Sequence, residues 1–504
     1  MDFDAVPYDL PGPTSHRIAD VRRAYEEFTR HGLLIMGEKI AQEGAYDSNE
    51  SGHFAWDVSL LIRAACLTWR VTRDPLHLRQ ATTWAQHIID RTDEALGRVN
   101  WRNRVVPAWS TGPRYTAGTA LVGSIGGAPV ELQAASERVV IERPSEDTAI
   151  IRSIRPDGAV WSSLEGSLLP SSPDYLPDLL ARRSSIHSVL LRGLPAAIDL
   201  RFLEAGEFPI ESQYAAHLVH TGMIARSLIA AAEALEAAGD DASASAISTE
   251  ELYEAARRSL FLHDDEIRVR EGQSWYVTLL DFPSRRLGLE LPHNHVVDAA
   301  TSFLVLGRRF DDRGLRGLGA SLTRPFLDEI RKYRTGDLPH PWYYYPVDSD
   351  MFAGISRDEP MAERKVPPVR RGEDSSHATM RVRSLVEWHA IDPRLVPPET
   401  LSEVALAFRR NFMTAQHGIT TLRWLPAGPG DSPDAPRVGH ANTYAGAWGA
   451  LAPWDPTMKR RINSMAYRHP PTQVFGATVL SAAEIVAMNA GVPTYASSDQ
   501  IARG

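Results

Sequence analysis

The sequence has one cysteine, no run of 18 apolar residues and no excess of basic charge, and each absence excludes a class of protein. A single cysteine, Cys66, rules out an internal disulfide. The missing apolar run argues against a membrane-spanning helix. The net charge of −9 argues against a nucleic-acid-binding surface. The amino-terminal residues lack the basic and apolar regions of a secretory signal, so the sequence predicts a cytoplasmic protein.

The motifs of several common enzyme classes are missing as well. The chain has no Walker loop, no GxGxxG after a strand, no GxSxG elbow and no EF-hand loop. It also has no paired cysteines and no His-x-x-x-His spacing, so we expect no metal site and no cofactor. The expected partner is a small molecule or an oligosaccharide, without nucleic acid or membrane.

Helical periodicity dominates what the sequence does contain. Asp74 and Pro75 form a helix start signal, and Gly239 ends the clearest helix of the chain. Apolar residues recur at helical spacing in twelve segments, which are 15–38, 53–71, 77–95, 210–237, 243–261, 294–308, 312–333, 374–390, 398–414, 441–451, 456–467 and 476–490. The sequence therefore predicts a protein dominated by α-helices.

Two segments depart from this pattern. Residues 129–161 alternate apolar and polar side chains around a Pro-Asp-Gly turn, which predicts a small β-sheet insertion. Residues 334–373 are rich in Pro, Tyr, Asp and Arg and have no helical period. A loop of that length inside a compact domain is usually functional or mobile, so we interpret it as an active-site loop.

Six expected helix starts share an unusual composition. Each begins with polar or aromatic residues and continues with Ala, Gly and Ser, and in most of the gaps an ordinary amphipathic helix can be placed. The six groups are His53; Trp109, Arg114 and Tyr115; Tyr214 and His217; His293, Asn294 and His295; Glu373, Asp374 and His377; and His440, Asn442 and Tyr444. This rhythm predicts a single (α/α)6 toroid over residues 1–504, in which the inner helices begin on one face and favour anionic groups there. The alternative is an irregular helical protein whose histidines only cap helices.

Asn294 and His295 at a helix start resemble the Asn-His element of (α/α)-toroid polysaccharide lyases, such as alginate lyases and heparinase-type lyases. In that family an Arg and a catalytic Tyr follow in a later loop, where this chain offers Arg334 and Tyr343–Tyr345. The resemblance covers the expected toroid only. His293 stands where the family often has a first Asn, and the sequence shows no sign of the β-sandwich domain that many such lyases carry.

The resemblance implies an enzyme that cleaves a uronic-acid-containing oligosaccharide by β-elimination. Neutralising the uronate carboxylate acidifies the C5 proton, and the reaction then needs a base for that proton and an acid for the leaving oxygen. Asn294 and His295 would hold the carboxylate, Arg334 would add charge, and Tyr343 or Tyr344 would move protons. Returning the proton to the opposite face would instead give a C5-epimerase.

Asp374 and His377 are spaced i,i+3, so they share one face of the expected helix, with Arg381 one turn further on. They are interpreted as a dyad that tunes a general base, with a helix cap or a metal-ligand pair as alternatives. The expected catalytic residues are therefore His295, Tyr343, Tyr344, Asp374 and His377. The other polar residues of the six helix starts, together with Arg334 and Arg381, are expected to bind substrate.

Three other functions remain open at this stage. A glycoside hydrolase would use two carboxylates from the group Asp57, Asp348, Asp350, Glu373 and Asp374. An isoprenoid dehydratase or cyclase could use the same toroid, although the chain has no DDxxD or DxDD element. A non-enzymatic scaffold would need the polar helix starts only as caps.

Overall fold

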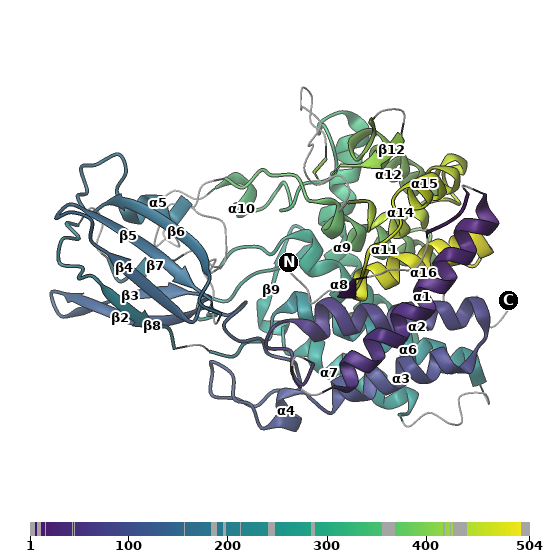
Figure 1. The fold of residues 1–504 in the computed structure, drawn as a ribbon, viewed down its shortest axis with the longest axis horizontal. Coiled ribbons are helices and arrows are strands. Elements are labelled where there is room, and N and C mark those ends of the chain that lie inside the picture. Colours follow the sequence, from purple (N-terminus) through teal and green to yellow (C-terminus); the bar gives the residue numbers. More distant parts are fainter. Residues whose placement is uncertain are drawn as a thin grey trace.

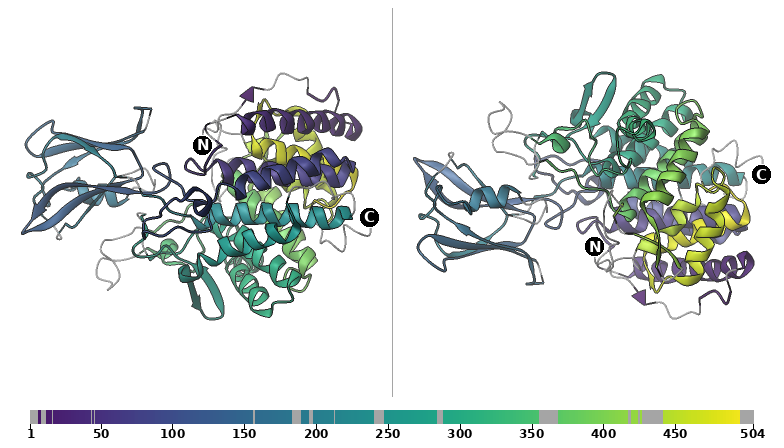
Figure 2. Two further views of the ribbon diagram at one scale, coloured as in Figure 1. Left: turned by 90° about the horizontal axis from the view of Figure 1, so that it is seen from below. Right: turned by 90° about the horizontal axis from the view of Figure 1, so that it is seen from above.

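The computed structural model consists of a helical body and a β-rich unit that projects from it (Figures 1 and 2). Helices dominate the fold and the strands are concentrated in the insertion, as the sequence predicted. The structure describes the chain except for residues 1–5, 8–11, 16, 43, 45, 156, 183–188, 195–197, 212, 240–246, 284–287, 355–367, 417–418, 424, 427–440 and 495–504.

Twelve helices of the described residues form the main part of the helical body. Six of them contact one another in the cyclic order α2, α6, α8, α11, α14, α16 and back to α2, and we call these the inner helices. Each packs most extensively against one outer helix, in the same order α3, α7, α9, α12, α15 and α1. The twelve are α1 (Ile18–Ala41), α2 (Ser59–Thr72), α3 (Pro75–Ile89), α6 (Leu218–Ala238), α7 (Thr249–Phe261), α8 (His293–Arg309), α9 (Arg313–Thr335), α11 (Ser375–Ile391), α12 (Pro398–Asn411), α14 (Ala445–Gly449), α15 (Pro456–Arg468) and α16 (Gly476–Ala490).

The first and last helices of the chain pack together in this arrangement. The first helix, α1, packs against the last, α16, and the short strand β1 (Val6–Pro7) pairs with β13 (Gln473–Val474). Figure 1 shows α1 and α16 side by side. The remaining short elements of the body are the π-helix η1 (Phe54–Val58), α4 (Asp93–Leu96), the 3-10 helix η3 (Asp264–Glu266), α10 (Asp350–Ala353), and the hairpins β9 (Ile267–Arg270)–β10 (Gln273–Tyr276) and β11 (Met413–Gln416)–β12 (Ile419–Leu422).

Local signals explain where most helices begin and end. The Asp74 carboxylate accepts a hydrogen bond from the backbone N–H of Leu76 and caps α3, which has Pro75 in its first turn. Gly239 follows α6 with a φ of 57°. The expected helix that would begin at Trp109 is wrong, because residues 98–117 are irregular and lead into a strand.

By length and composition, α6 is apolar enough to cross a membrane. In this fold 89% of the most apolar 18-residue stretch of α6 is buried among the other helices. A helix that is apolar on all sides is expected wherever other helices surround it. Its composition is therefore explained by its place in the inner ring.

The β-rich unit is larger than the sequence suggested. Its strands span residues 118–209, whereas the alternating pattern predicted only 129–161, because β2 has weak alternation and β7 and β8 are short. The first sheet has the order β2-β3-β7 and the second β6-β5-β4-β8, both antiparallel. The strands are β2 (Gly118–Ile125), β3 (Ala128–Ala134), β4 (Arg138–Glu142), β5 (Thr148–Ile154), β6 (Val160–Ser167), β7 (Leu190–Arg192) and β8 (Gly206–Pro209), with helix α5 (Leu176–Arg182) beside β6 and β7.

Both sheets contribute to one hydrophobic core that is separate from the core of the helical body. Leu132 comes from the first sheet and Ile141 and Ile151 from the second, and all three are at most 1% exposed. Two sheets that share a core form a sandwich. The expectation that the chain lacks a sandwich is therefore wrong, and the insertion forms a unit with its own core.

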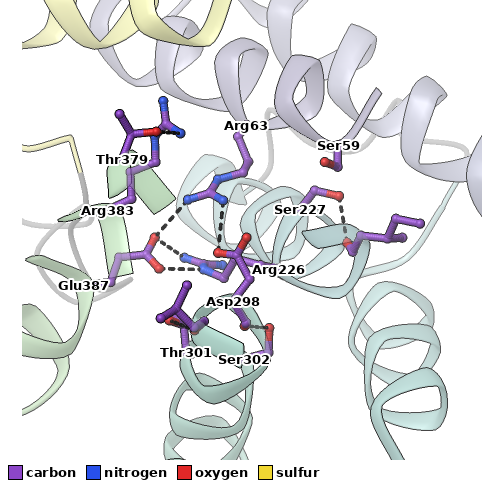
Figure 3. Close-up of polar contacts among 12 residues, drawn as sticks. Ser59, Arg63, Arg226, Ser227, Asp298, Thr301, Ser302, Thr379, Arg383 and Glu387 are labelled. Carbon is purple, nitrogen blue, oxygen red and sulfur yellow. Dashed lines mark hydrogen bonds and ion pairs between the residues drawn. The ribbon is translucent and has the colours of Figure 1, made fainter. Parts of the chain in front are cut away.

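An ionic network fills the space between the inner helices (Figure 3). Glu387 of α11 accepts two hydrogen bonds from Arg226 of α6, at 2.9 and 3.0 Å, and lies 4.0 Å from Arg63 of α2. Arg63 also approaches Asp298 of α8 at 3.4 Å. All four side chains are at least 93% buried, and burial raises the pKa of Asp298. Charged groups from four inner helices therefore meet in the core.

The close contact between α14 and α16 leads to a testable prediction. A Cβ added to Gly446 would lie 1.9 Å from the carbonyl oxygen of Ser481, so we expect Gly446→Ala to destabilise the protein by about 2 kcal/mol or more. Gly317 in α9 is the matched control, because a Cβ there meets nothing within 4 Å. Gly317→Ala is expected to be neutral or stabilising by up to about 1 kcal/mol. Urea unfolding measures both, and equal stabilities would contradict the prediction.

Candidate functional site

Polar and aromatic side chains gather where α6, α8 and α11 begin. We call this group the mouth cluster. It comprises Trp56, Tyr115, His217, His220, His295, Tyr344, Asp374 and His377. Seven of them are joined to the group by contacts described below, and His295 is near enough for its charge to lower the pKa of His220. Six of the eight come from the helix starts or the loop that the sequence singled out, and Trp56 and His220 are new.

His377 and Asp374 form a hydrogen-bonded pair at the start of α11. His377 Nδ1 lies 2.6 Å from Asp374 Oδ2, while Asp374 Oδ1 accepts from the backbone N–H groups of Ser376 and His377. Burial opposes protonation of His377, but the Asp374 carboxylate outweighs it and raises the His377 pKa. Burial would likewise raise the pKa of Asp374, but His377 and the hydrogen bonds lower it. The predicted dyad is present and also caps the helix.

Tyr344 lies against this pair. Its ring centre is 6.0 Å from that of His377, with the rings edge to face. The guanidinium of Arg371 stacks on the Tyr344 ring at 4.0 Å. Within the described part of the chain, no carboxylate forms an ion pair with Arg371. A phenol, an imidazole and an arginine are therefore next to one another.

Trp56 and His220 link the two sides of the mouth cluster. The Trp56 indole N–H donates to His220 Nε2 at 2.9 Å, and the Trp56 ring lies 6.1 Å from His377. Burial, followed by the neighbouring charges of His217 and His295, lowers the His220 pKa well below its ordinary value. His220 is thus held neutral with Nε2 as acceptor. The i,i+3 spacing of His217 and His220 could have revealed it, since such residues share a helix face.

Tyr115, His217 and His295 complete the mouth cluster on the α6 and α8 side. The Tyr115 ring lies 4.9 Å from His220, and the Arg114 guanidinium lies 5.6 Å from the centre of the Tyr115 ring. His217, the residue before α6, lies 5.8 Å from His220. Arg114 has no ion-pair partner among the residues that the structure describes. Arg114 and Arg371 thus add positive charge near a group of aromatic rings.

Several residues expected to bind substrate have other roles. Arg334 belongs to the last turn of α9 and not to a loop; it is exposed, 3.6 Å from Glu403. The Trp109 indole is buried and donates to the carbonyl of Ile88, and Tyr214 stacks under Arg98. These three residues therefore lie outside the mouth cluster, and each has a partner within the protein.

The starts of η1 and α14 also differ from the expectation. The centre of the His53 ring lies 5.0 Å from that of Tyr46. The Tyr46 hydroxyl donates to Asp57, which also accepts from the backbone N–H of Gly476 at the start of α16. The Asn442 amide oxygen accepts from the backbone of Leu422. His53 and Asn442 are both buried, and their contacts support the fold. Tyr444 lies just before α14, and its pKa is raised mainly by burial and also by the charge of Asp374. His440 lies outside the described residues.

Four further candidates lie behind the mouth cluster. Arg381 and Glu373 are fully buried and paired at 2.8 Å, and His293 is bonded to Glu329 at 2.8 Å. Burial raises the pKa of Glu373 to about 7, against the effect of Arg381. The Tyr343 ring packs on His340 at 4.4 Å. Direct substrate contact by Arg381, Glu373 and His293 is therefore contradicted, since none of the three is more than 4% exposed.

Asn294 differs from these buried neighbours. It is 1% exposed, and neither its amide oxygen nor its amide nitrogen has a hydrogen-bond partner among the described residues. It lies one helical turn before Asp298, on the same face of α8. A buried amide without a partner costs about 1–3 kcal/mol, so a water or a ligand group is expected to satisfy it.

A second set of residues has the connectivity of a catalytic triad but not the access. His263 Nε2 lies 2.9 Å from the Thr221 hydroxyl, and His263 Nδ1 lies 2.6 Å from Glu266. A nucleophile, a base and an orienting carboxylate are bonded in this order in many hydrolases. Thr221 is only 1% exposed, which closes it to a substrate. These bonds therefore tie α6 to the segment before β9.

A pocket opens between α8, α9 and β10. Most of its lining is apolar, which does not suit an anionic ligand. The residues that line it include Trp275, Tyr276, His293, Phe326 and Trp388. Across the residues with described positions, no three His, Cys, Asp or Glu side chains are arranged to hold a metal ion.

Comparison with known proteins adds no family to these observations. Neither a protein-family model nor a curated protein sequence matches this chain. Function is therefore argued from the mouth cluster alone.

The pair of His377 and Asp374 makes stability depend on pH. The interaction that raises the His377 pKa stabilises the fold fully below pH 6.5, the ordinary pKa of histidine. This stabilisation is lost as the pH rises through the raised pKa of His377. The interactions that lower the Asp374 pKa stabilise the fold above pH 3.8, the ordinary pKa of aspartate, and this stabilisation is lost as the pH falls through the lowered pKa. Asn also caps helices, so Asp374→Asn removes the charge but keeps the cap. We therefore expect this variant to be most destabilised between pH 3.8 and pH 6.5, where the charged pair contributes most. Urea unfolding at about pH 5 and about pH 9 checks this, and equal losses would contradict it.

Proposed function

We propose that the ring of six inner and six outer helices is an (α/α)6 toroid, and that the protein cleaves a uronic-acid-containing oligosaccharide by β-elimination. One observation carries the proposal: Tyr344 lies against the His377–Asp374 pair and under the guanidinium of Arg371. An acid, a base and a positive charge are the three groups that the elimination needs.

The positive charge has the task of neutralising the uronate carboxylate. Arg371 and the first turn of α8, which has no side-chain cap, favour an anion, because a helix N-terminus carries free N–H groups and a positive dipole end. The first turn of α11 is already capped by Asp374. Arg114 extends this positive region to the far side of the mouth cluster. Asn294 is 1% exposed and its amide has no partner among the described residues, so it is suited to hold a buried water and not to contact the carboxylate directly.

Each proton transfer can be assigned to one group. His377 Nε2 removes the C5 proton while Asp374 holds Nδ1, which fixes the tautomer of the base. The electrons of the C5–H bond form the C4–C5 double bond, the C4–O4 bond breaks, and Tyr344 protonates O4. The imidazolium then returns its proton to the phenolate. If the proton returned to C5 on the opposite face instead, the same groups would act as an epimerase.

The carboxylate pairs of a glycoside hydrolase have less support. Each carboxylate that the sequence offered for hydrolysis already has a partner or lies outside the mouth cluster. Asp57 accepts from Tyr46 and Gly476, Asp348 pairs with Lys332, Asp350 lies 4.0 Å from Arg268, Glu373 pairs with Arg381, and Asp374 holds His377. The isoprenoid alternative has less support too, because the mouth cluster is rich in imidazoles.

The test is incubation with oligosaccharides of glucuronate, galacturonate, mannuronate and guluronate. Elimination produces a C4–C5 unsaturated uronate, which absorbs in the ultraviolet, together with one new reducing end for each cleavage. Reducing ends without that absorbance would mean hydrolysis, and deuterium uptake at C5 without cleavage would mean epimerisation. Asp348→Asn is the control variant: elimination should survive it, whereas hydrolysis by that carboxylate should not.

A further inference from the structure

A buried ionic group lies directly behind the mouth cluster. Arg381 is fully buried, donates to Glu373 at 2.8 Å and approaches Glu329 at 3.4 Å. Its guanidinium lies 3.8 Å from the centre of the Phe326 ring. Glu329 is also bonded to His293 at 2.8 Å. We call His293, Glu329, Glu373 and Arg381 the buried anchor.

The buried anchor binds the backbone of the segment that carries Tyr344, residues 341–347, which we call the tyrosine segment. Four consecutive carbonyl oxygens of this segment accept hydrogen bonds from it. The donors are Arg381 Nη2 to Pro341 O at 2.8 Å, the Glu373 N–H to Trp342 O at 2.7 Å, Arg381 Nη1 to Tyr343 O at 2.8 Å, and the His293 N–H to Tyr344 O at 3.2 Å. In addition, Glu329 Oε1 accepts from the backbone N–H of Val347 at 2.9 Å.

The consequence is a defined direction for each tyrosine. Tyr343 forms an isolated β-bridge with Gly372, and the chain bends at Tyr344, so the two side chains meet different neighbours. The Tyr343 ring packs on His340 and Phe352, at 4.4 and 5.1 Å, whereas the Tyr344 ring lies 6.0 Å from His377. A shift of the backbone by one residue would remove the Tyr344 ring from its place beside His377. Holding the carbonyls therefore decides which tyrosine meets the imidazole.

We propose that Arg381 is a positioning residue, which holds the tyrosine segment so that Tyr344 lies against His377. An arginine suits this task because its planar fork donates to several acceptors at fixed angles. Arg381 bridges two backbone carbonyls and two carboxylates from one buried position. A lysine has one nitrogen and would reach only some of these acceptors.

The experiment compares Arg381→Lys with Arg383→Lys by hydrogen exchange and mass spectrometry on the full chain. Arg383 is the matched control because it lies on the same helix, is also buried and is paired with Glu484 through two hydrogen bonds, at 2.7 and 3.0 Å. We expect Arg381→Lys to speed exchange of the amides of residues 341–347 by about 10-fold or more, because their local opening becomes easier. Arg383→Lys should leave exchange in that segment close to wild type.

Equal exchange in the two variants, or no change in Arg381→Lys, would overturn the proposal. If Arg381→Lys does not fold, Glu373→Gln takes its place, measured at about pH 9, above the Glu373 pKa of about 7, where it removes the charge that orients the guanidinium and keeps the side-chain shape. Faster exchange confined to residues 341–347 in that variant supports the proposal, and unchanged exchange overturns it.

The catalytic consequence rests on the proposed function, whereas the exchange measurement does not. With an active uronate substrate, Arg381→Lys should lower kcat by about 10- to 100-fold with KM within a few-fold, because the displaced Tyr344 is needed in the reaction rather than for binding. Arg383→Lys should keep kcat per folded molecule. Wild-type protein that is inactive on every uronate, with faster exchange in Arg381→Lys, would refute the proposed function and leave the positioning role standing.

Discussion

Replacing His377 with alanine is expected to lower turnover by about 100-fold or more, the usual contribution of a general acid or base. The same change should shift the melting temperature by only a few degrees. The Asp374 carboxylate keeps its hydrogen bonds from the backbone N–H groups of Ser376 and residue 377, so the start of α11 stays capped without the imidazole. Turnover on the responsive uronate substrate, together with thermal unfolding of the same preparation, measures both quantities.

His389 provides the control for this experiment. It lies on the same helix and bonds to the carbonyl of Val396, and its ring packs on Trp454, away from the mouth cluster. His389→Ala should change stability modestly and leave turnover per folded molecule unchanged. A His377→Ala protein with much lower stability and unchanged turnover would mean that the histidine only supports the fold.

Replacing Glu387 with leucine is expected to destabilise the protein by about 1–3 kcal/mol, because Arg226 and Arg63 lose a buried partner, although Arg226 keeps Glu233 at 3.1 Å and Arg63 keeps Asp298 at 3.4 Å. Glu387 neutralises Arg226 directly and also approaches Arg63, and Figure 3 shows both guanidinium groups beside its carboxylate. Both arginines are about 6–7% exposed, so water cannot replace the lost partner. The free energy of unfolding in urea measures the loss.

An exposed ion pair serves as the comparison. Arg394 pairs with Asp392 at 3.1 Å, but its side chain is 92% exposed. Water and salt screen such a pair, so Arg394→Ala should leave the unfolding midpoint at the wild-type value. Similar losses in Glu387→Leu and Arg394→Ala would show that the buried network contributes no more than a surface pair.

The helices of the body were largely readable from the sequence. Residues 476–490 were predicted as a helix with the bounds that α16 has, and 294–308 differs from α8 by one residue at each end. Helix bounds depend on local signals, namely apolar spacing, a capping side chain and a stop residue. These signals lie within a few positions of one another, so one sequence is enough to find them.

The candidate site was only partly readable. The i,i+3 spacing of Asp374 and His377 revealed the dyad, because both residues lie on one helix. The same reasoning placed Arg334 in a loop and Arg381 at the substrate, and both assignments are wrong. Charged residues are usually exposed, and no local pattern around Arg381 indicates that it is fully buried.

By itself the sequence determined the helical class, most helix bounds, the presence of a β insertion and the dyad, because each follows from residues close together in the chain. Only the tertiary structure decided that Trp56 meets His220, that α1 packs on α16, and that four carbonyls of residues 341–347 bind the buried anchor. These contacts join residues from about 30 to more than 400 positions apart. They depend on the packing of whole helices, which no local pattern of side chains encodes.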